Sequence, residues 1–180
     1  ESVARRGISA EMVESFGIGF ALDSFEGLLA KAQASRVDLP LLEAAGLVKR
    51  NNRGGVFDTF RNRLMFPIID ATGRIVGFGG RTLADDPAKY LNSPATALFD
   101  KSMSLFGLNA ARQPIAAAGR AIVVEGYTDC IMAHQFGLTE TIATLGTAMT
   151  DGHANLLRRY TDRVVLLFDS DQAGQRAADR

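Results

Sequence analysis

The sequence is poor in the residues that build disulfide frameworks and zinc sites. It contains one cysteine, Cys130, and two histidines, His134 and His153, none of which has a partner at metal-ligand spacing. Cys130 follows Asp129 on the apolar face of a predicted helix, so we interpret it as a core thiol. We interpret both histidines as structural or surface residues. These absences exclude a disulfide scaffold and a zinc site from this chain.

The sequence also lacks an excess of charge and a membrane-spanning segment. Its 20 Lys and Arg residues balance its 20 Asp and Glu residues, so no overall basic signal indicates nucleic acid. No apolar run approaches the roughly 18 residues of a transmembrane helix, and no secretory signal pattern is found. We therefore expect no membrane association and a cytoplasmic location. The 47% of hydrophobic residues is ample for a core.

The charges that are present are distributed unevenly along the chain. Residues 49–81 carry seven basic residues against two acids, whereas residues 119–180 carry six basic residues against eight acids. A basic half beside an acidic pocket suits a polyanion held near a metal ion. The distribution therefore favours nucleic acid or nucleotides as ligands, in spite of the neutral total.

Two apolar runs in the second half each lead directly into acids. Residues 121–124 precede Glu125, and residues 164–168 precede Asp169 and Asp171. Short Val-rich runs of this kind are typical of strands buried on both faces of a parallel sheet. Helices predicted at 127–136 and 151–160, with a strand at 141–144, complete a doubly wound pattern. We expect the two acid-bearing strands to be neighbours, so that their carboxyl ends form one ligand crevice.

The acids at these strand ends predict a metal site. Carboxylates gathered at one sheet edge resist ionising beside one another, and a hard divalent cation relieves that repulsion. Oxygen-only ligation suits Mg²⁺ or Mn²⁺. The alternative is that each acid merely ends a strand in water, and that Asp129 occupies the favourable first turn of a helix. We favour the metal site because several acids occur at strand ends of one predicted sheet.

The first half predicts a mixed α+β subdomain over residues 1–118, packed on the sheet of residues 119–180. Gly7 ends a first short helix and Ser9 caps a second. A strand at 17–22, helices at 25–34 and 39–45, and two hairpins follow; the hairpins pair 47–50 with 56–60, and 63–70 with 74–81. The fold class is therefore α/β, with the boundary between the halves at 116–120.

Two stretches of the first half are unusual for structure alone. Gly77, Gly79 and Gly80 interrupt a predicted strand, which indicates either a β-bulge or the close approach of another group to the backbone. The segment from Lys89 to Pro94 sets a cation, an aromatic ring and an amide in a loop before proline. Such a combination can bind phosphate and stack on a base.

Several motifs together resemble the catalytic core of bacterial DnaG-type primases. They are, in order, DTFRNRLMFPIIDATGRIVGFGGR, KYLNSP, VVEGYTD, TLGTAMT and FDSDQAG. The acidic motifs alone resemble the Toprim pattern, which type IA topoisomerases, RecR-type proteins and some nucleases share. The basic segments, GFGGR and KYLNSP single out primase. The resemblance implies a Toprim subdomain over residues 119–180.

The resemblance also implies roles for individual residues. Glu125, Asp169 and Asp171 would be catalytic and metal-binding acids, with Asp129 beside them. A basic surface for template, nucleotide or primer would comprise Arg6, Arg61, Arg81, Lys89, Tyr90, Asn92 and Lys101. Two or more Mg²⁺ or Mn²⁺ ions would assist nucleotidyl transfer, because metals can activate a 3′-hydroxyl and neutralise developing charge.

The implied partners are single-stranded DNA template, nucleoside triphosphates, the RNA primer and a replicative helicase. The helical patterns at both chain ends predict that this sequence is a core fragment of a longer protein. The resemblance implies that a zinc-binding domain, a helicase-binding domain and a further acidic pair lie outside it. Two other functions remain open at this point: a DNA-cleaving Toprim enzyme, and a non-catalytic binding module with a receiver-like acidic pocket.

Overall fold

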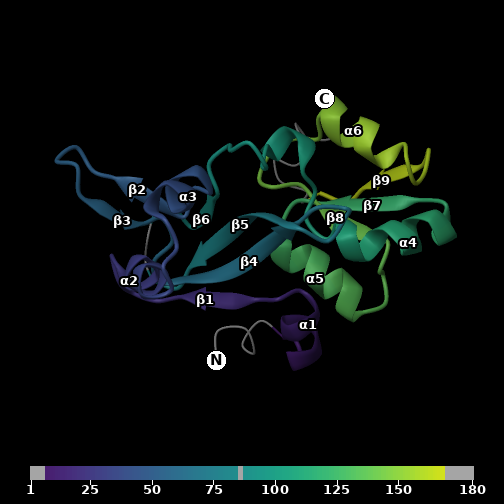
Figure 1. Ribbon diagram of the computed structural model, residues 1–180. Coiled ribbons are helices and arrows are strands. Elements are labelled where there is room, and N and C mark those ends of the chain that lie inside the picture. Colours follow the sequence, from purple (N-terminus) through teal and green to yellow (C-terminus); the bar gives the residue numbers. More distant parts are fainter. Residues whose placement is uncertain (1–6, 85–86, 169–180) are drawn as a thin grey trace.

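A computed structural model describes residues 7–84 and 87–168 (Figure 1). The predicted helix before Gly7 lies outside these residues, as do Arg6, Asp169 and Asp171. The first half contains α1 (Ala10–Ser15), β1 (Gly19–Ala21), α2 (Gly27–Ala34), α3 (Leu39–Ala44), β2 (Val48–Arg50), β3 (Val56–Asp58), β4 (Arg63–Ile69), β5 (Ile75–Thr82) and β6 (Tyr90–Asn92). The second contains the 3-10 turn η2 (Lys101–Met103), α4 (Leu108–Ala118), β7 (Ala121–Val124), α5 (Tyr127–Gln135), β8 (Thr141–Ala143), α6 (Asp151–Leu157) and β9 (Val164–Leu166).

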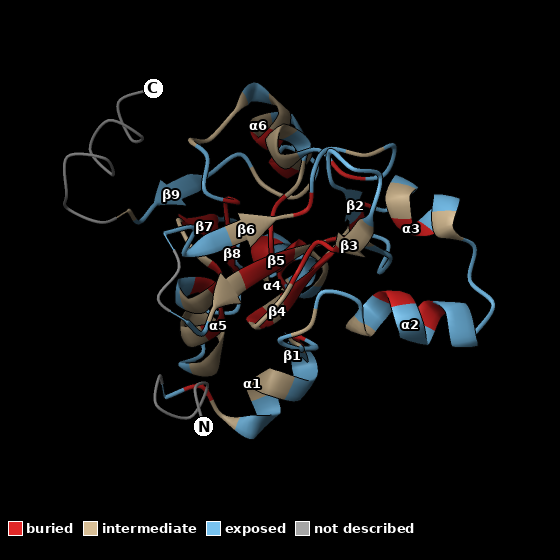
Figure 2. Ribbon diagram, turned by 90° about the vertical axis from the view of Figure 1, so that its left-hand side faces the viewer, coloured by how far each residue is buried: buried red, intermediate tan, exposed pale blue. Residues whose placement is uncertain are grey.

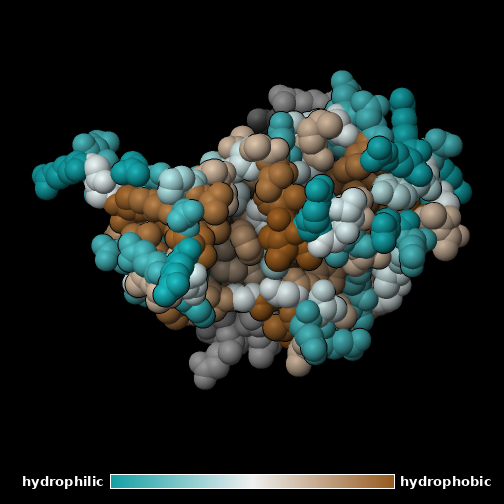
Figure 3. All heavy atoms as spheres, viewed as in Figure 1, coloured by the Kyte–Doolittle hydropathy of each residue, from teal (hydrophilic) through white to brown (hydrophobic). Residues whose placement is uncertain are grey.

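An antiparallel sheet of order β1-β4-β5-β6 organises the first half. Its central hairpin pairs β4 with β5, as predicted, and the separate β2–β3 hairpin was also predicted correctly. Helix α1 begins where expected, because the Ser9 side chain accepts a hydrogen bond from the Met12 N–H. In Figure 3 hydrophobic residues gather on the lobe of α2 and the β2–β3 hairpin, where an apolar groove is lined partly by Phe20, Leu28 and Phe78.

A parallel sheet of order β8-β7-β9 organises the second half. Alternate residues of β7 enter two separate cores, because successive side chains of a strand point to opposite faces. Ile122 and Val124 pack with Cys130 and Ile131 of α5. On the other face, the remaining β7 residues Ala121 and Val123 pack with Ala111 and Ile115 of α4 and Leu157 of α6. Helices therefore cover both faces, which confirms the doubly wound arrangement and its fully buried central strand.

The prediction for residues 164–168 was wrong in one respect. Strand β9 pairs with β7 in parallel, as expected, with Val165 opposite Ile122 and the Leu167 N–H donating to the Val123 carbonyl at 2.8 Å. Its side chains are not buried on both faces, however: Val165 is 46% exposed and Leu167 is 60% exposed. Burial of a strand's faces requires elements that cover them, and within residues 7–84 and 87–168 the one strand beside β9 is β7.

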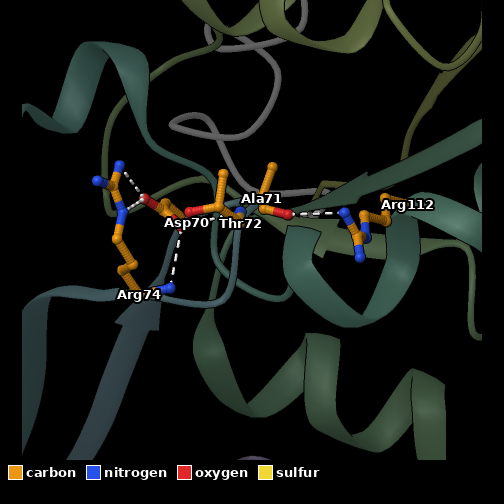
Figure 4. Close-up of polar contacts among 5 residues, drawn as sticks. All are labelled: Asp70, Ala71, Thr72, Arg74 and Arg112. Atoms are coloured by element: carbon orange, nitrogen blue, oxygen red, sulfur yellow. Dashed lines mark hydrogen bonds and ion pairs between the residues drawn. The ribbon is translucent and has the colours of Figure 1, made fainter.

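The two halves share one core (Figure 2), in which β4 of the first sheet and β7 of the second are both buried. Phe66 of β4 stacks on the Tyr127 ring of α5, with 5.0 Å between centroids, and Phe106 meets that ring edge-on at 4.9 Å. A polar contact lies at the β4–β5 turn (Figure 4), where Arg112 of α4 donates to the Ala71 carbonyl at 2.9 Å. These contacts fix α4 and α5 against the first sheet.

The β4–β5 turn itself is held by one carboxylate. Asp70 accepts hydrogen bonds from the Thr72 and Arg74 backbone N–H groups and pairs with the Arg74 guanidinium at 2.8 Å (Figure 4). The hydrogen bond from the Thr72 hydroxyl, followed by those from Arg74, holds the pKa of Asp70 well below its usual range. These hydrogen bonds shape the turn whose Ala71 carbonyl accepts from Arg112 of α4.

Cysteine and histidine have structural roles, as predicted. Cys130 is fully buried in the shared core, and this burial raises the pKa of its thiol. The buried His153 ring contacts the Lys101 carbonyl at 2.8 Å and completes a capping box with Thr150 at the start of α6. The half-buried His134 ring contacts the Thr141 carbonyl at 2.7 Å. No helix within residues 7–84 and 87–168 has the length and apolarity to cross a bilayer.

Candidate functional site

A polar cleft of about 420 Å³ lies where the carboxyl end of β7 meets the β5–β6 edge of the first sheet. Its lining comprises Arg81, Lys89, Tyr90, Asn92, Glu125, Gly126, Tyr127, Thr128, Asp129, Leu145 and Gly146. Arg81 and Glu125 are 44 positions apart in the sequence. The fold therefore brings cations from one half and acids from the other to a single depression, as the resemblance implies.

The acidic side of the cleft follows directly from the parallel sheet. Glu125 comes immediately after β7 and is partly buried, while Asp129 is exposed in the first turn of α5. A side chain at Gly126 would place its Cβ 2.7 Å from an Asp129 carboxylate oxygen, so glycine permits this close approach. Strand β9 pairs in parallel with β7 as far as Leu166, and Asp169 comes three residues later in the sequence.

The described part of the chain contains two of the four acids that were predicted to bind metal. There, no group of three or more His, Cys, Asp or Glu side chains gathers as a metal site. Asp169 and Asp171 are outside this part, so the predicted set of four acids is represented by Glu125 and Asp129 alone. The donor atoms of the full set are all carboxylate oxygens, which is the chemistry that Mg²⁺ and Mn²⁺ prefer.

The basic side of the cleft is the β5–β6 edge, in which Arg81 pairs with Tyr90 across the ladder. The Arg81 guanidinium lies over the Tyr90 ring, 5.6 Å from its centroid. Its Nε is buried and has no hydrogen-bond partner in the described structure. A buried donor without a partner is costly. An anion in the cleft would supply the missing acceptor, and Lys89 lies exposed beside it.

The floor of the cleft contains a hydrogen-bonded link that sequence reasoning missed. The Tyr127 hydroxyl donates to the Asn92 side-chain oxygen, and the Asn92 amide nitrogen donates to the Leu145 carbonyl at 2.8 Å. Burial, and then the neighbouring Tyr90, raises the pKa of the Tyr127 hydroxyl, which keeps it protonated as a donor. The position of Tyr127 two residues after Glu125 is the one signal that could have singled it out.

Close approach explains Gly79 and Gly80 of β5, whereas Gly77 adjoins an irregularity in the strand pairing. Ile68 pairs with Gly77 and Ile69 with Ile75, which leaves Val76 as an extra residue on β5, and the pairing is regular from Gly77 to Thr82. A Cβ at Gly79 would overlap the Tyr127 ring, and one at Gly80 would lie 2.9 Å from the Phe60 ring. The absence of side chains therefore lets the Tyr127 ring of the second half rest directly on the β5 backbone.

The comparisons with known proteins agree with this architecture. Residues 2–112, more than half of the chain, match the family model described as DNA primase catalytic core, N-terminal domain. The chain belongs to this DNA primase family. Residues 122–180 match a Toprim-like model, so the acid-bearing sheet is a Toprim sheet. The resemblance to DnaG-type primases is thereby confirmed.

Relatives of this primase-family chain are longer proteins. The DNA primase of Deinococcus radiodurans is 48% identical over 96% of this chain, and that of Clostridium acetobutylicum is 45% identical over 97%. The chain spans 30% and 29% of their lengths. The solved Escherichia coli primase catalytic core superposes with a TM-score of 0.91 at 42% identity, covering 99% of this chain and 57% of that one.

Several solved relatives were determined with nucleic acid. A DnaG primase catalytic domain bound to ssDNA superposes on this chain with a TM-score of 0.88 at 42% identity. The match covers 98% of this chain and 57% of that one. The fold class predicted from the sequence, a mixed subdomain on a Toprim sheet, is confirmed by these structures.

Two residues predicted for the basic surface of the primase core lie away from the cleft. The Arg61 guanidinium lies 4.6 Å from the Phe25 ring centroid and 5.3 Å from that of Phe57. Arg61 lines a separate polar pocket, whose wall includes Thr82 and Leu91. Lys101 lies in η2 and does not line the cleft. Arg6 falls outside the described residues.

Proposed function

We propose that this chain forms the polymerising cleft of a DNA primase, which joins ribonucleotides into a short RNA primer on single-stranded DNA. The observation that carries the proposal is the shared lining of one cleft by Arg81 and Lys89 on one side and Glu125 and Asp129 on the other. Nucleotide joining requires both, because phosphates need cations and metal ions need carboxylates.

Arg81, Lys89 and Tyr90 bind the nucleic acid or nucleotide in this proposal. The Arg81 Nε supplies an N–H donor that has no partner in the described protein, and guanidinium can bind two phosphate oxygens at once. Lys89 adds a point charge. Tyr90 is 43% exposed and presents a ring on which a base can stack. Such contacts are indifferent to base sequence, so binding is salt-sensitive and tolerant of sequence.

Glu125, Asp169 and Asp171, with Asp129 beside them, would hold Mg²⁺ or Mn²⁺. Support comes from the adjacency of β7 and β9, since Glu125 follows the first and Asp169 comes three residues after the second. The donor set contains oxygen only, which fits these ions. When bound, two or more such ions activate the primer 3′-hydroxyl and offset the charge that develops on the phosphates.

The remaining partners follow from the same proposal. The chemistry requires nucleoside triphosphates and the growing RNA primer as ligands of the cleft. Arg61 and Lys101 would contact nucleic acid beyond the cleft, and Asn92 would belong to its floor. Arg6, which lies outside the described residues, stays a predicted nucleic-acid contact. Association with a replicative helicase, through a domain outside this chain, and a cytoplasmic location at the replication fork remain predictions.

Titration of labelled single-stranded DNA at several salt concentrations tests the basic side of the cleft. Arg81→Ala and Lys89→Ala should each weaken binding about equally for different DNA sequences, and each should lower the salt slope by about 0.7. Arg163→Ala is the matched control, because Arg163 precedes β9 at the opposite end of the sheet from the cleft. Unaltered slopes for both cleft variants would remove the case for this surface.

A further inference from the structure

Tyr127 is a cleft residue of α5 that contacts the first sheet through both its ring and its hydroxyl. It is only 4% exposed, and its hydroxyl donates to Asn92 of β6. Asn92 in turn donates to the Leu145 carbonyl, after β8, at 2.8 Å. The hydrogen bonds therefore join three elements: α5 next to Glu125, the edge strand that carries Tyr90, and the loop after β8.

The Tyr127 ring has no room to move. Phe66 stacks on one face with an interplanar angle of 3°, and Phe106 packs edge-on at 87°. The β5 backbone at Gly79 approaches it so closely that even a methyl group there would overlap the ring. A ring held on these sides keeps its hydroxyl in one place, and the hydroxyl in turn keeps the Asn92 amide in one orientation.

Strand β6 depends on the hydrogen bond between Tyr127 and Asn92 more than the other strands of its sheet do. β6 has three residues and pairs with β5 alone, from Tyr90 to Asn92. Before it, Arg63 donates to the Ala88 carbonyl at 2.8 Å. After it, the Ser93 N–H donates to the Phe78 carbonyl at 2.8 Å. Among the hydrogen bonds of β6, those of the Asn92 side chain are the ones that reach the acid-bearing half.

From this arrangement we propose that Tyr127 is a positioning residue, which aligns the Lys89–Tyr90 edge with the strand end at Glu125 through its hydrogen bond to Asn92. The inference rests on the proposed function, and it adds a role for a residue that contacts neither phosphate nor metal in that proposal. A phenylalanine would fill the same aromatic cluster. The hydroxyl is therefore the part of the side chain that a purely structural role does not require.

Tyr127→Phe in the full chain tests the proposal with two independent measurements. Hydrogen–deuterium exchange should become at least five-fold faster in the amides of residues 90–93, while the β2–β3 hairpin is unchanged. Primer synthesis should lose at least ten-fold in kcat, with the KM for ribonucleotide within two-fold of wild type, because alignment and not ground-state binding is affected. Tyr160→Phe, three residues after the end of α6, is the matched control and should change neither.

A double-mutant cycle with Asn92→Ala sharpens the test. If the hydrogen bond carries the effect, the double variant should be no slower than the slower single variant; two independent roles would instead multiply their losses. Unchanged hydrogen–deuterium exchange in Tyr127→Phe would show that the Tyr127 hydroxyl does not hold β6 in place. Faster exchange with an unchanged kcat would overturn the positioning role. Absence of primer synthesis by the full-length wild-type protein that contains this chain would contradict the proposed function, and the exchange measurement alone would then decide whether Tyr127 holds β6 in place.

Discussion

The substitution Gly79→Ala tests how the two halves of the primase core fit together. Gly79 lies in the middle of β5, opposite Phe66 of β4 and Asn92 of β6. Its added methyl group would overlap the Tyr127 ring, which cannot retreat because Phe66 and Phe106 pack against it. Overpacking of this kind costs about 1–3 kcal/mol in the free energy of unfolding. For a chain of this size, the expected fall in Tm is about 2–12 °C.

Gly19→Ala provides the matched control for this substitution. Gly19 is also in a strand of the same sheet, but an added Cβ there would meet nothing within 4 Å. Alanine at such a position stabilises by about 0.4–1 kcal/mol, because it restricts the unfolded chain. Urea unfolding monitored by circular dichroism compares the two variants with wild type. Equal stability of Gly79→Ala and Gly19→Ala would refute the close approach of the Tyr127 ring to Gly79.

Two further predictions concern stability. Asp58 of β3 accepts hydrogen bonds from the Leu28 and Leu29 N–H groups and so caps α2, because the side chain of the N-cap residue Glu26 makes no capping hydrogen bond. Asp58→Ala should lower the free energy of unfolding in urea by about 0.5–2 kcal/mol. An unchanged urea midpoint would contradict the capping role. Burial lowers the pKa of His134, so its contribution to stability is fully present above the unfolded value near 6.5 and is lost as pH falls below it. The Tm of wild type should therefore fall more than that of His134→Gln between pH 7.5 and pH 5.5, and equal falls would count against this assignment.

The element that the sequence predicted best is β7, which is buried on both faces by helices next to it in the chain. The run at 121–124 lies between Arg120 and Glu125 and became β7 with the same bounds. The pattern of the 164–168 run is equally apolar, yet β9 is exposed. Apolarity predicts a strand, whereas burial depends on which elements cover it, and a single strand's composition does not contain that information.

The sequence predicted the charged side chains of the candidate site but not the packing and hydrogen bonds that hold them in place. The acids and cations of the cleft belong to short motifs, so Glu125, Arg81 and Lys89 could be selected from the sequence. The link from Tyr127 to Asn92 joins positions 35 residues apart and arises only when the two halves pack. The same applies to Arg61, whose guanidinium lies over the ring of Phe25, which precedes α2, and near the ring of Phe57 in β3. Long-range packing of this kind has no periodic signature.

A crystal of the chain grown with Mn²⁺ and a short single-stranded DNA tests the central claim most directly. The account predicts anomalous Mn²⁺ peaks coordinated by Glu125 and by Asp169 or Asp171, with DNA phosphate beside Arg81 and Lys89 in the same cleft. Asp171→Ala should weaken Mn²⁺ binding without altering the fold. Peaks remote from Glu125, or DNA bound outside the cleft that Arg81 and Glu125 share, would contradict the account.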